Sequence, residues 1–304
     1  MENLKQKIRN NFAVIVILLA LFFTFLAGCG ISVHVPTEKD SQTASSELKV
    51  HFIDVGQADS ILIMNGSQSM LIDAGNNDDE KLVVDYLKEQ GISKLDYVIG
   101  THPHEDHIGG LDAVIDNFAI GQVYLPNVPH TTKTFFDVVE AIRKKDLKIT
   151  LPMPGTTFNL GEGACTILAP NSDSYEDLNN YSIVIKVEYG DTVFLFTGDA
   201  EKESETEMLK KGYDLTADVL KIGHHGSSFS TTEDFLNKVN PQYAVIMCGK
   251  GNSYGHPHRE TMNRLKNKGI KVYRTDESGT IVCSSDGKNI SFNVEPGSYL
   301  KERE

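Results

Sequence analysis

The chain has 304 residues, enough for one large domain or two small ones with a sizeable core. Hydrophobic residues make up 40% and charged residues 23%, a balance that is typical of a soluble globular chain and excludes a disordered or multi-span membrane protein. Lys and Arg total 29 against 42 Asp and Glu, which gives a net charge of -13. This charge disfavours nucleic-acid binding, because phosphate backbones are bound by clustered basic side chains, although bound metal ions can reverse the field locally.

The N-terminus has the pattern of a secretory signal. Three basic residues precede an uncharged apolar run over residues 12–27. The run is shorter than the roughly 20 residues that a membrane span needs. It ends in Leu26-Ala27-Gly28-Cys29, which resembles the bacterial lipoprotein processing box. This resemblance implies that Cys29 is lipidated and anchors the mature chain to the membrane.

The domain boundaries follow from this pattern. We expect residues 1–28 to be a lipoprotein signal peptide and residues 29–47 to be a polar tether without apolar periodicity. Residues 48–293 are expected to form the folded domain, followed by a C-terminal tail at 294–304. The predicted location is the extracytoplasmic face of a bacterial cell membrane.

Apolar runs bounded by turn signals predict the elements of the domain. The first part is predicted to contain strands at 50–53, 61–64, 70–72, 95–99 and 123–125, with helices at 78–90, 108–117 and 134–145. The second part is predicted to contain strands at 166–168, 183–187, 193–196, 219–222, 243–247 and 272–274, with helices at 232–239 and 260–268. Two sheet-rich halves that are each covered by helices indicate an α/β fold, a four-layer α/β/β/α sandwich.

Four potential metal ligands lie within six residues after the predicted strand at 95–99. They are His102, His104, Asp106 and His107. If the chain is extended through Pro103, the first two share a face with period two, and the last two come from the following turn and helix start. One segment can therefore serve two metal ions.

Two further strand ends carry candidate ligands. Asp199 follows an apolar strand in Thr197-Gly198-Asp199, so its carboxylate reaches the sheet edge and can bridge two metals. The alternative is that Asp199 caps a helix that starts near residue 201. His224 and His225 follow the predicted strand at 219–222. Adjacent side chains diverge, so one imidazole can bind a metal while the other faces the substrate.

Together these residues resemble the metallo-β-lactamase superfamily, which has the α/β/β/α sandwich and the His-x-His-x-Asp-His loop. Within it the chain resembles the hydrolase domain of ComEC-type competence proteins and their stand-alone relatives. The segments that carry the resemblance are His51–Ser60, Leu71–Gly75, Asn179–Ser182, Leu220–Ser227 and Tyr254–His258. The first departs slightly, with Ala58 where Gly is usual.

The resemblance implies a role for each candidate. One metal is bound by His102 and His104, the other by Asp106, His107 and His225, and Asp199 bridges them. Asp106 and His224 are the implied catalytic residues, since Asp106 orients the attacking water and His224 faces the substrate. The implied cofactors are two divalent metal ions, zinc or manganese, because His and Asp suit both.

The resemblance also implies which residues surround the metal ligands. The expected residues that orient ligands or contact substrate are Asp54, Asp73, Asn179, Lys221 and His256. Asp73 would orient the ligand loop by hydrogen bonding, and Lys221 would neutralise charge on the substrate. Many superfamily members have a further His before the bridging Asp. Here only His130 lies between the loop and Asp199, far from a suitable strand, so Asn179 or Asn180 takes that position.

The predicted activity is hydrolysis of a phosphodiester by a hydroxide that bridges two metals. Single-stranded DNA and an envelope phosphodiester such as teichoic acid are the candidate substrates. One alternative is a carbonyl hydrolase that acts on a lactone, lactam or thioester, with lactams disfavoured by the missing His. Another is a non-catalytic, metal-stabilised module for DNA binding or uptake.

The remaining cysteines and two histidines lack such a context. Cys165, Cys248 and Cys283 lie in apolar runs without ligand-like spacing and are expected to be buried in the core. His34 and His51 are expected to be structural or to lie on the surface.

Overall fold

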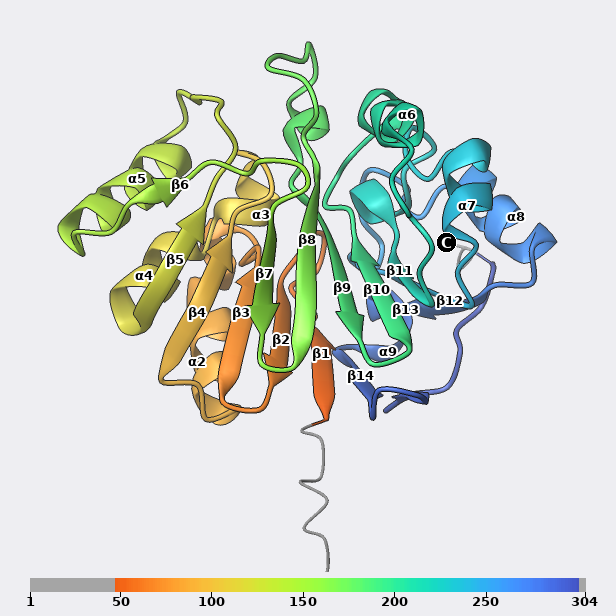
Figure 1. Cartoon of the computed structure of the whole chain (residues 1–304), viewed down its shortest axis with the longest axis horizontal. Coiled ribbons are helices and arrows are strands. Elements are labelled where there is room, and N and C mark those ends of the chain that lie inside the picture. Colours follow the sequence, from red (N-terminus) through yellow and green to blue (C-terminus); the bar gives the residue numbers. More distant parts are fainter. Residues whose placement is uncertain (1–46, 301–304) are drawn as a thin grey trace, which may run out of the picture. The chain divides into compact units, whose positions relative to one another are not determined.

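The computed structural model describes residues 47–300 (Figure 1). The predicted signal peptide, Cys29, His34 and almost all of the predicted tether lie outside the described residues, as do the last four residues of the chain. Across residues 47–300, no helix combines the length and the apolar character that a membrane span requires.

Two sheets form the middle of the domain. The first sheet has the order β15 (Ile290–Phe292), β14 (Ile281–Ser285), β1 (Leu48–Phe52), β2 (Ile61–Asn65), β3 (Gln68–Ile72), β4 (Lys94–Ile99), β5 (Ala119–Tyr124) and β6 (Ile149–Thr150). The second has the order β13 (Lys271–Arg274), β12 (Tyr243–Ile246), β11 (Val219–Lys221), β10 (Thr192–Phe196), β9 (Val184–Tyr189), β8 (Gly163–Ala169) and β7 (Thr157–Leu160). Both sheets mix parallel and antiparallel pairs.

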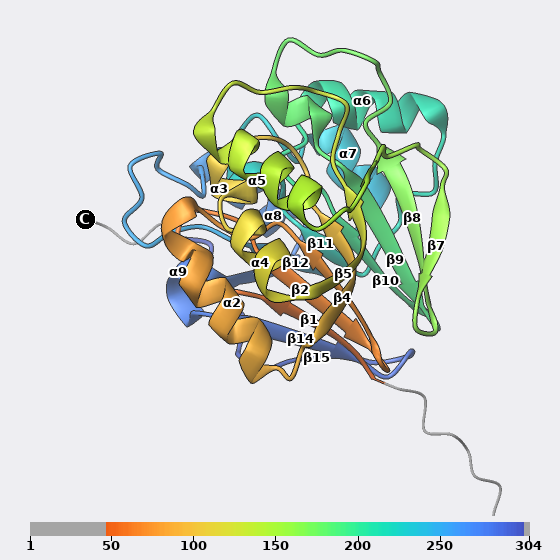
Figure 2. The same ribbon diagram turned by 90° about the vertical axis from the view of Figure 1, so that its left-hand side faces the viewer.

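Helices cover the outer face of each sheet (Figures 1 and 2). The first sheet carries η1 (Asn77–Asp79), α2 (Glu80–Glu89), α3 (Glu105–Ile108), α4 (Leu111–Asn117) and α5 (Lys133–Lys144). The second carries α6 (Lys202–Lys211), α7 (Glu233–Val239) and α8 (Arg259–Asn267). The short elements η2 (Leu178–Tyr181), η3 (Gly223–Gly226) and α9 (Thr275–Ser278) connect strands.

Alternation along the strands builds three apolar layers. In β2, Ile61 and Ile63 point into the core between the sheets, whereas Leu62 points to the helices on the outer face. Both faces of a strand are thus buried, which explains why the strands read as continuous apolar runs. A third layer lies between the second sheet and its helices and includes Leu220 and Phe235. The predicted four-layer α/β/β/α sandwich is confirmed.

Every strand and helix predicted from the sequence is present, with shifted ends. The predicted helix at 108–117 is two helices, α3 and α4, interrupted at Gly109 and Gly110. A Cβ on Gly109 would lie 2.2 Å from the carbonyl carbon of Asn76, so only glycine permits this close approach. The sequence raised α6 only within the alternative reading of Asp199 as a helix cap. It missed the short helix α9 and the strands β6, β7, β14 and β15, which are short, partly polar or at sheet edges.

Residues of the predicted tail pack onto the domain. Val294 lies against the core between the sheets, and the Tyr299 hydroxyl donates a hydrogen bond to the Ile270 carbonyl at 2.5 Å. The buried Arg274 donates to the carbonyls of Ser298 and Leu300. The folded domain therefore continues beyond residue 293. Cys165, Cys248 and Cys283 are buried, as predicted, and the structure shows them unpaired, a point that the sequence left open.

The topology brings several strand ends to one edge. β10, β11 and β12 are parallel neighbours, so the segments after them emerge side by side. β4 is parallel to β3 in the other sheet, and the loop after β4 leads into α3. Polar side chains that follow these strands can therefore meet although they are far apart in sequence.

Candidate metal centre

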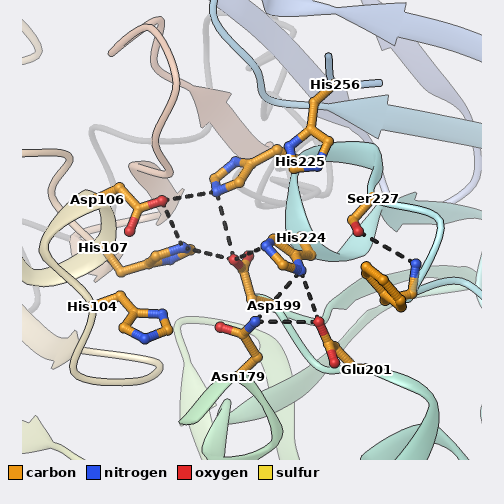
Figure 3. Close-up of polar contacts among 12 residues, drawn as sticks. His104, Asp106, His107, Asn179, Asp199, Glu201, His224, His225, Ser227 and His256 are labelled. Atoms are coloured by element: carbon orange, nitrogen blue, oxygen red, sulfur yellow. Dashed lines mark hydrogen bonds and ion pairs between the residues drawn. The ribbon is translucent and has the colours of Figure 1, made fainter. Parts of the chain in front are cut away.

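Four side chains converge at this edge (Figure 3). Asp106 and His107 belong to α3, Asp199 follows β10, and His225 lies in η3 after β11. Each offers one ligand atom, and these atoms all lie within 4.8 Å of one another. The N-cap of α6 is Glu201, so Asp199 is not the cap that the sequence left open as an alternative.

The distances within the group suit one shared cation. Asp199 Oδ2 lies 3.2 Å from His107 Nε2 and 3.6 Å from His225 Nε2. Asp106 Oδ2 lies 3.2 Å from His225 Nε2 and 3.8 Å from His107 Nε2. Two imidazoles and two carboxylates form a donor set that is typical of zinc or manganese.

Unsatisfied atoms show that the group fits a metal. Within residues 47–300, His107 Nε2 and Asp199 Oδ1 are buried and have no hydrogen-bond partner, although buried polar atoms normally have one. Burial alone lowers the pKa of an imidazole. The carboxylates of Asp199 and Asp106 outweigh burial and hold the pKa of His107 well above its ordinary value. The cluster thus favours positive charge, which metal ions would supply.

His107 is oriented from behind by Asp73. Asp73 Oδ2 lies 2.8 Å from His107 Nδ1, and the same carboxylate accepts from the backbone N–H and the hydroxyl of Thr101 at 2.8 and 2.7 Å. Because the carboxylate only accepts, His107 Nδ1 carries the proton and the Nε2 lone pair faces the cluster. The structure thus places Asp73 where the sequence predicted an orienting residue.

His225 is oriented in the same way by a different set. Its Nδ1 lies 2.9 Å from the Met247 carbonyl oxygen and 3.3 Å from Asp59 Oδ1, so the Nε2 lone pair again faces the cluster. Asp59 Oδ2 is paired at 2.7 Å with Lys221 Nζ, which also donates to the Ile222 carbonyl. Both Asp59 and Lys221 are buried.

This pairing corrects two expectations from the sequence. Lys221 stands behind His225 and does not line the pocket, so the role of neutralising substrate charge does not fit it. Asp54 also lies outside the pocket, where its carboxylate accepts from the Gly56 N–H in a turn. The acid of this segment that contacts the centre is Asp59, which the sequence reasoning did not single out.

The other side of Asp199 holds two histidines from the loop after β4. His102 Nε2 lies 2.9 Å from His104 Nδ1. The hydroxyl proton of Thr101 goes to Asp73, so Thr101 Oγ1, at 3.1 Å, accepts from His102 Nδ1. The Nε2 lone pair of His102 therefore points toward His104, as expected of two ligands of one ion.

The side-chain amide of Asn179 is a third candidate ligand on the side of Asp199 that holds His102 and His104. Asn179 Nδ2 lies 3.2 Å from Glu201 Oε1, and its Oδ1 is buried without a hydrogen-bond partner among the described residues. Asn180 Oδ1 instead accepts from the backbone N–H groups of Glu201 and Ser204. Of the two asparagines that the sequence left open, Asn179 is the one with an available oxygen in the pocket.

The backbone directs the paired histidines apart. His224 and His225 have φ values of 50° and 52°, a left-handed conformation that is unfavourable for residues other than glycine. His224 Nδ1 lies 3.0 Å from Glu201 Oε1, and its Nε2 lies 3.8 Å from Asp199 Oδ2. Both imidazoles therefore reach Asp199, and His225 is the one that lies among the four converging ligand atoms.

A pocket of about 320 Å³ opens over the centre. It is lined by Gln57, His104, Glu105, Asp106, Asn179, Asp199, His224, His225, Tyr254 and His256. His256 lines this pocket, where it can meet substrate as the sequence led us to expect. Gln57 and Tyr254 were missed because their side chains are not typical metal ligands, and Glu105 and the nearby Glu201 because single acids are common on protein surfaces.

Two histidines outside the ligand set are also placed. The centroid of the His130 ring lies 6.4 Å from that of His104, so His130 is nearer the centre than its sequence context suggested. His51 is buried, and its Nδ1 lies 2.8 Å from the Tyr86 hydroxyl, which fits the predicted structural role.

Comparison with known families agrees with this fold and site. Residues 53–250 match the model of the metallo-β-lactamase superfamily, so the chain belongs to that superfamily. The crystal structure of the metallo-β-lactamase fold protein YhfI from Bacillus subtilis superposes with a TM-score of 0.55 at 15% identity, covering 79% of this chain and 100% of YhfI. At this identity the likeness supports the fold alone.

Within the superfamily the chain is similar to competence proteins. ComE operon protein 3 of Bacillus subtilis is 32% identical over 270 residues, which are 83% of this chain and 35% of that protein. Competence protein ComA of Neisseria gonorrhoeae is 31% identical over 238 residues, which are 78% of this chain and 32% of that protein. The chain thus spans about a third of the length of these curated relatives.

Proposed function

We propose that this chain is a lipid-anchored, extracytoplasmic phosphodiesterase with two divalent metal ions. The observation that carries the proposal is the convergence of Asp106, His107, Asp199 and His225 at the base of an open pocket, with His102 and His104 on the other side of Asp199. Such two-ion sites suit in-line displacement at phosphorus. Superfamily membership and the metal-capable cluster support a hydrolase.

The proposed ligands are His102 and His104 for one ion, Asp106, His107 and His225 for the other, and Asp199 for both. When bound, such ions lower the pKa of a water molecule and neutralise charge on a phosphate. The side chain of Asp106 is 34% exposed, so its carboxylate can orient a water and accept its proton. His224 faces the pocket from the opposite side and is held there by Glu201.

The substrate must present a small phosphodiester to a pocket of about 320 Å³. The competence relatives favour single-stranded DNA. The net charge of -13 weighs against a long polyanion, and the predicted membrane tether suits an envelope phosphodiester, such as a phosphorylcholine ester of teichoic acid, equally well. Binding of DNA at low salt tests the charge argument, because this repulsion is screened least there.

Turnover of model esters tests the reaction class. The chain from Glu47 onward, loaded with zinc or with manganese, should hydrolyse a bis-aryl phosphate faster than a lactone, lactam or thioester reporter. Metal-free protein is the control. Cleavage of a carbonyl ester by protein that leaves every phosphodiester intact would replace this proposal with a carbonyl hydrolase. Metal-replete protein without turnover on any reporter would favour the non-catalytic module.

Membrane anchoring is tested separately on the full chain. Cys29 follows the signal-like run, so Cys29→Ser should block lipidation and either release the protein or leave it unprocessed. Fractionation with mass measurement checks this, with Cys165→Ser as the matched control. A Cys29→Ser protein that stays on the membrane at the processed mass would contradict the lipid anchor.

A further inference from the structure

The loop after β12 holds His256 in one orientation. Asn252 Nδ2 donates to the carbonyls of Gly249 and His256 at 2.8 and 2.7 Å, and Asn252 Oδ1 accepts from the His256 N–H at 3.0 Å. His256 is 6% exposed and lies at the pocket wall, with its ring centroid 6.2 Å from that of His225 (Figure 3).

Gln57 determines which nitrogen of His256 carries the proton. Gln57 Oε1 accepts from the Gly249 N–H at 3.0 Å, and because a backbone N–H can only donate, the orientation of the amide is fixed. Gln57 Nε2 is therefore the atom 3.2 Å from His256 Nδ1. An amide nitrogen only donates, so His256 Nδ1 is an acceptor without a proton. The neutral ring must then carry its proton on Nε2.

This tautomer is opposite to that of the histidines in the cluster. His107 and His225 have Nδ1 next to oxygen acceptors, so each presents an Nε2 lone pair for a metal. His256 presents an Nε2–H, which cannot bind a metal. None of the described residues accepts a hydrogen bond from this group. The pocket thus contains a fixed donor that has no partner within residues 47–300.

We propose that His256 Nε2–H donates a hydrogen bond to a non-bridging oxygen of the substrate phosphodiester, and that Gln57 is the positioning residue that sets this tautomer. The identity of the accepting oxygen rests on the proposed function, whereas the tautomer does not. Burial lowers the pKa of His256 to about 3, with His225 and His224 adding to the effect, so the donor is a neutral imidazole.

Tyr254 covers the outer side of this donor. Its ring stacks on that of His256 with centroids 5.8 Å apart and planes at 19°, while 69% of Tyr254 is exposed. The Tyr254 ring therefore shields the imidazole from bulk water on that side. Partial exclusion of water strengthens a hydrogen bond to a phosphate oxygen.

The same loop contains an internal control, His258. Its Nδ1 accepts from the Ser228 backbone N–H at 3.0 Å, and its Nε2 lies 3.2 Å from the Tyr254 carbonyl oxygen. The reasoning used for His256 also places the His258 proton on Nε2. That proton is already donated to a backbone carbonyl, so His258 should not respond to a ligand in the pocket.

The ¹⁵N resonances of the imidazoles test the tautomer directly. In the zinc-loaded protein, both His256 and His258 should have a protonated Nε2 and an unprotonated Nδ1. Added inorganic phosphate should shift the Nε2–H of His256 and leave that of His258 in place. A protonated Nδ1 on His256, zinc bound to its Nε2, or equal responses of the two rings would overturn the proposal.

Gln57→Glu tests the positioning role at constant size. The new carboxylate still accepts from Gly249 but also accepts from His256, so it should move the imidazole proton to Nδ1. We expect kcat/KM on a bis-aryl phosphate to fall about 10- to 100-fold, the range for a lost hydrogen bond to a charged group, with little change in Tm. Full activity alongside a reversed tautomer would refute the role of His256.

A pair of variants at His256 separates donation from packing. His256→Gln retains an N–H donor and should retain more activity than His256→Leu, which fills the space without one. Equal losses in both would refute donation to substrate. If the predicted tautomer and phosphate response are found but no phosphodiester is cleaved by the parent protein, the proposed function fails while the donor assignment stands.

Discussion

The two sides of the metal centre are built unequally. The four-ligand side consists of Asp106, His107, Asp199 and His225, whose ligand atoms lie within 4.8 Å of one another. The amide side consists of His102, His104 and Asn179 and shares Asp199 with the first. One side thus has two carboxylates, whereas the other has only the shared one and an amide oxygen.

The groups that orient the histidines also differ between the two sides. On the four-ligand side each imidazole is oriented by a carboxylate, Asp73 behind His107 and Asp59 behind His225. On the amide side His102 is oriented by hydroxyl groups of Thr101 and Ser182. Carboxylates behind a ligand raise its basicity more than hydroxyls do. We therefore expect one ion to be held tightly and the other weakly.

The largest effect is expected at Asp199, since it contacts both sides. Asp199→Ala should lose close to two metal equivalents and all detectable activity, more than either His224→Ala or His225→Ala. Metal analysis after dialysis checks this, with Asp54→Ala as a control because that carboxylate lies in a turn outside the pocket. Full occupancy in Asp199→Ala would show that Asp199 does not bridge the two sides.

Asp59 provides a test of the four-ligand side alone. Asp59→Asn should weaken the tighter ion about 10- to 100-fold, as loss of an outer partner does, and should destabilise the fold by about 3 to 5 kcal/mol, since it leaves Lys221 buried without its countercharge. Metal titration and urea unfolding of the metal-free protein measure the two effects.

The double variant Asp59→Asn, Lys221→Met separates the effect on metal affinity from the effect on stability. It removes the buried charge with its partner, so stability should recover while metal affinity stays low. Recovery of both would mean that Asp59 serves the fold and not the metal ligand His225.

Asn179 provides the corresponding test of the amide side. Asn179→His introduces the third imidazole that many superfamily members have, and it should tighten the weaker ion by about tenfold, because imidazole is the stronger ligand. Asn179→Ala should weaken the same ion. Zinc competition titrations resolve the two classes of site, and an unchanged weaker class in both variants would place Asn179 outside the ligand set.

Sequence reasoning predicted the ligands better than their surroundings, for a physical reason. His102, His104, Asp106 and His107 are contiguous and follow a strand, so local geometry alone places them together. Asp59 and Glu201 are common acids whose partners, Lys221 and His224, come from other strands. Only the packing of the two sheets brings these pairs into contact.

The sequence prediction selected Asp54 near the site and passed over Asp59, which shows where sequence reasoning reaches its limit. Both acids lie in the irregular segment between β1 and β2, where no period of two or 3.6 fixes which side chain faces inward. Edge strands were missed for a related reason: β6 has two residues and β15 three, which is too short for a pattern. The longer buried strands, which read as apolar runs, and the helices, which carry a helical period of apolar residues, were by contrast sufficient to predict the four-layer fold.

The smallest effect is expected at His51, a histidine whose role is separate from both sides of the centre. Burial, together with the charge of Lys49, lowers the pKa of His51 to about 4, and its Nδ1 lies 2.8 Å from the Tyr86 hydroxyl. The folded state therefore keeps His51 neutral, while the unfolded chain protonates near pH 6.5. The stability that this provides is fully present above pH 6.5 and is lost as the pH falls through 4.

The His51 contribution requires a difference measurement, because other groups titrate in the same pH range. Its upper limit between pH 6.5 and pH 4 is about 3 kcal/mol, at roughly 1.4 kcal/mol per unit of pKa shift, and solvent screening lowers it. His51→Gln retains a polar side-chain partner for Tyr86 and does not titrate in this range. The difference in the free energy of unfolding between parent and variant, measured with urea across these pH values, is therefore the contribution of His51. If both lose stability in parallel, the acid sensitivity comes from other groups, such as Asp106 and Asp199, whose pKa values are lowered in the fold. The raised pKa values of His107 and His225 have the opposite sign and stabilise the fold as the pH falls.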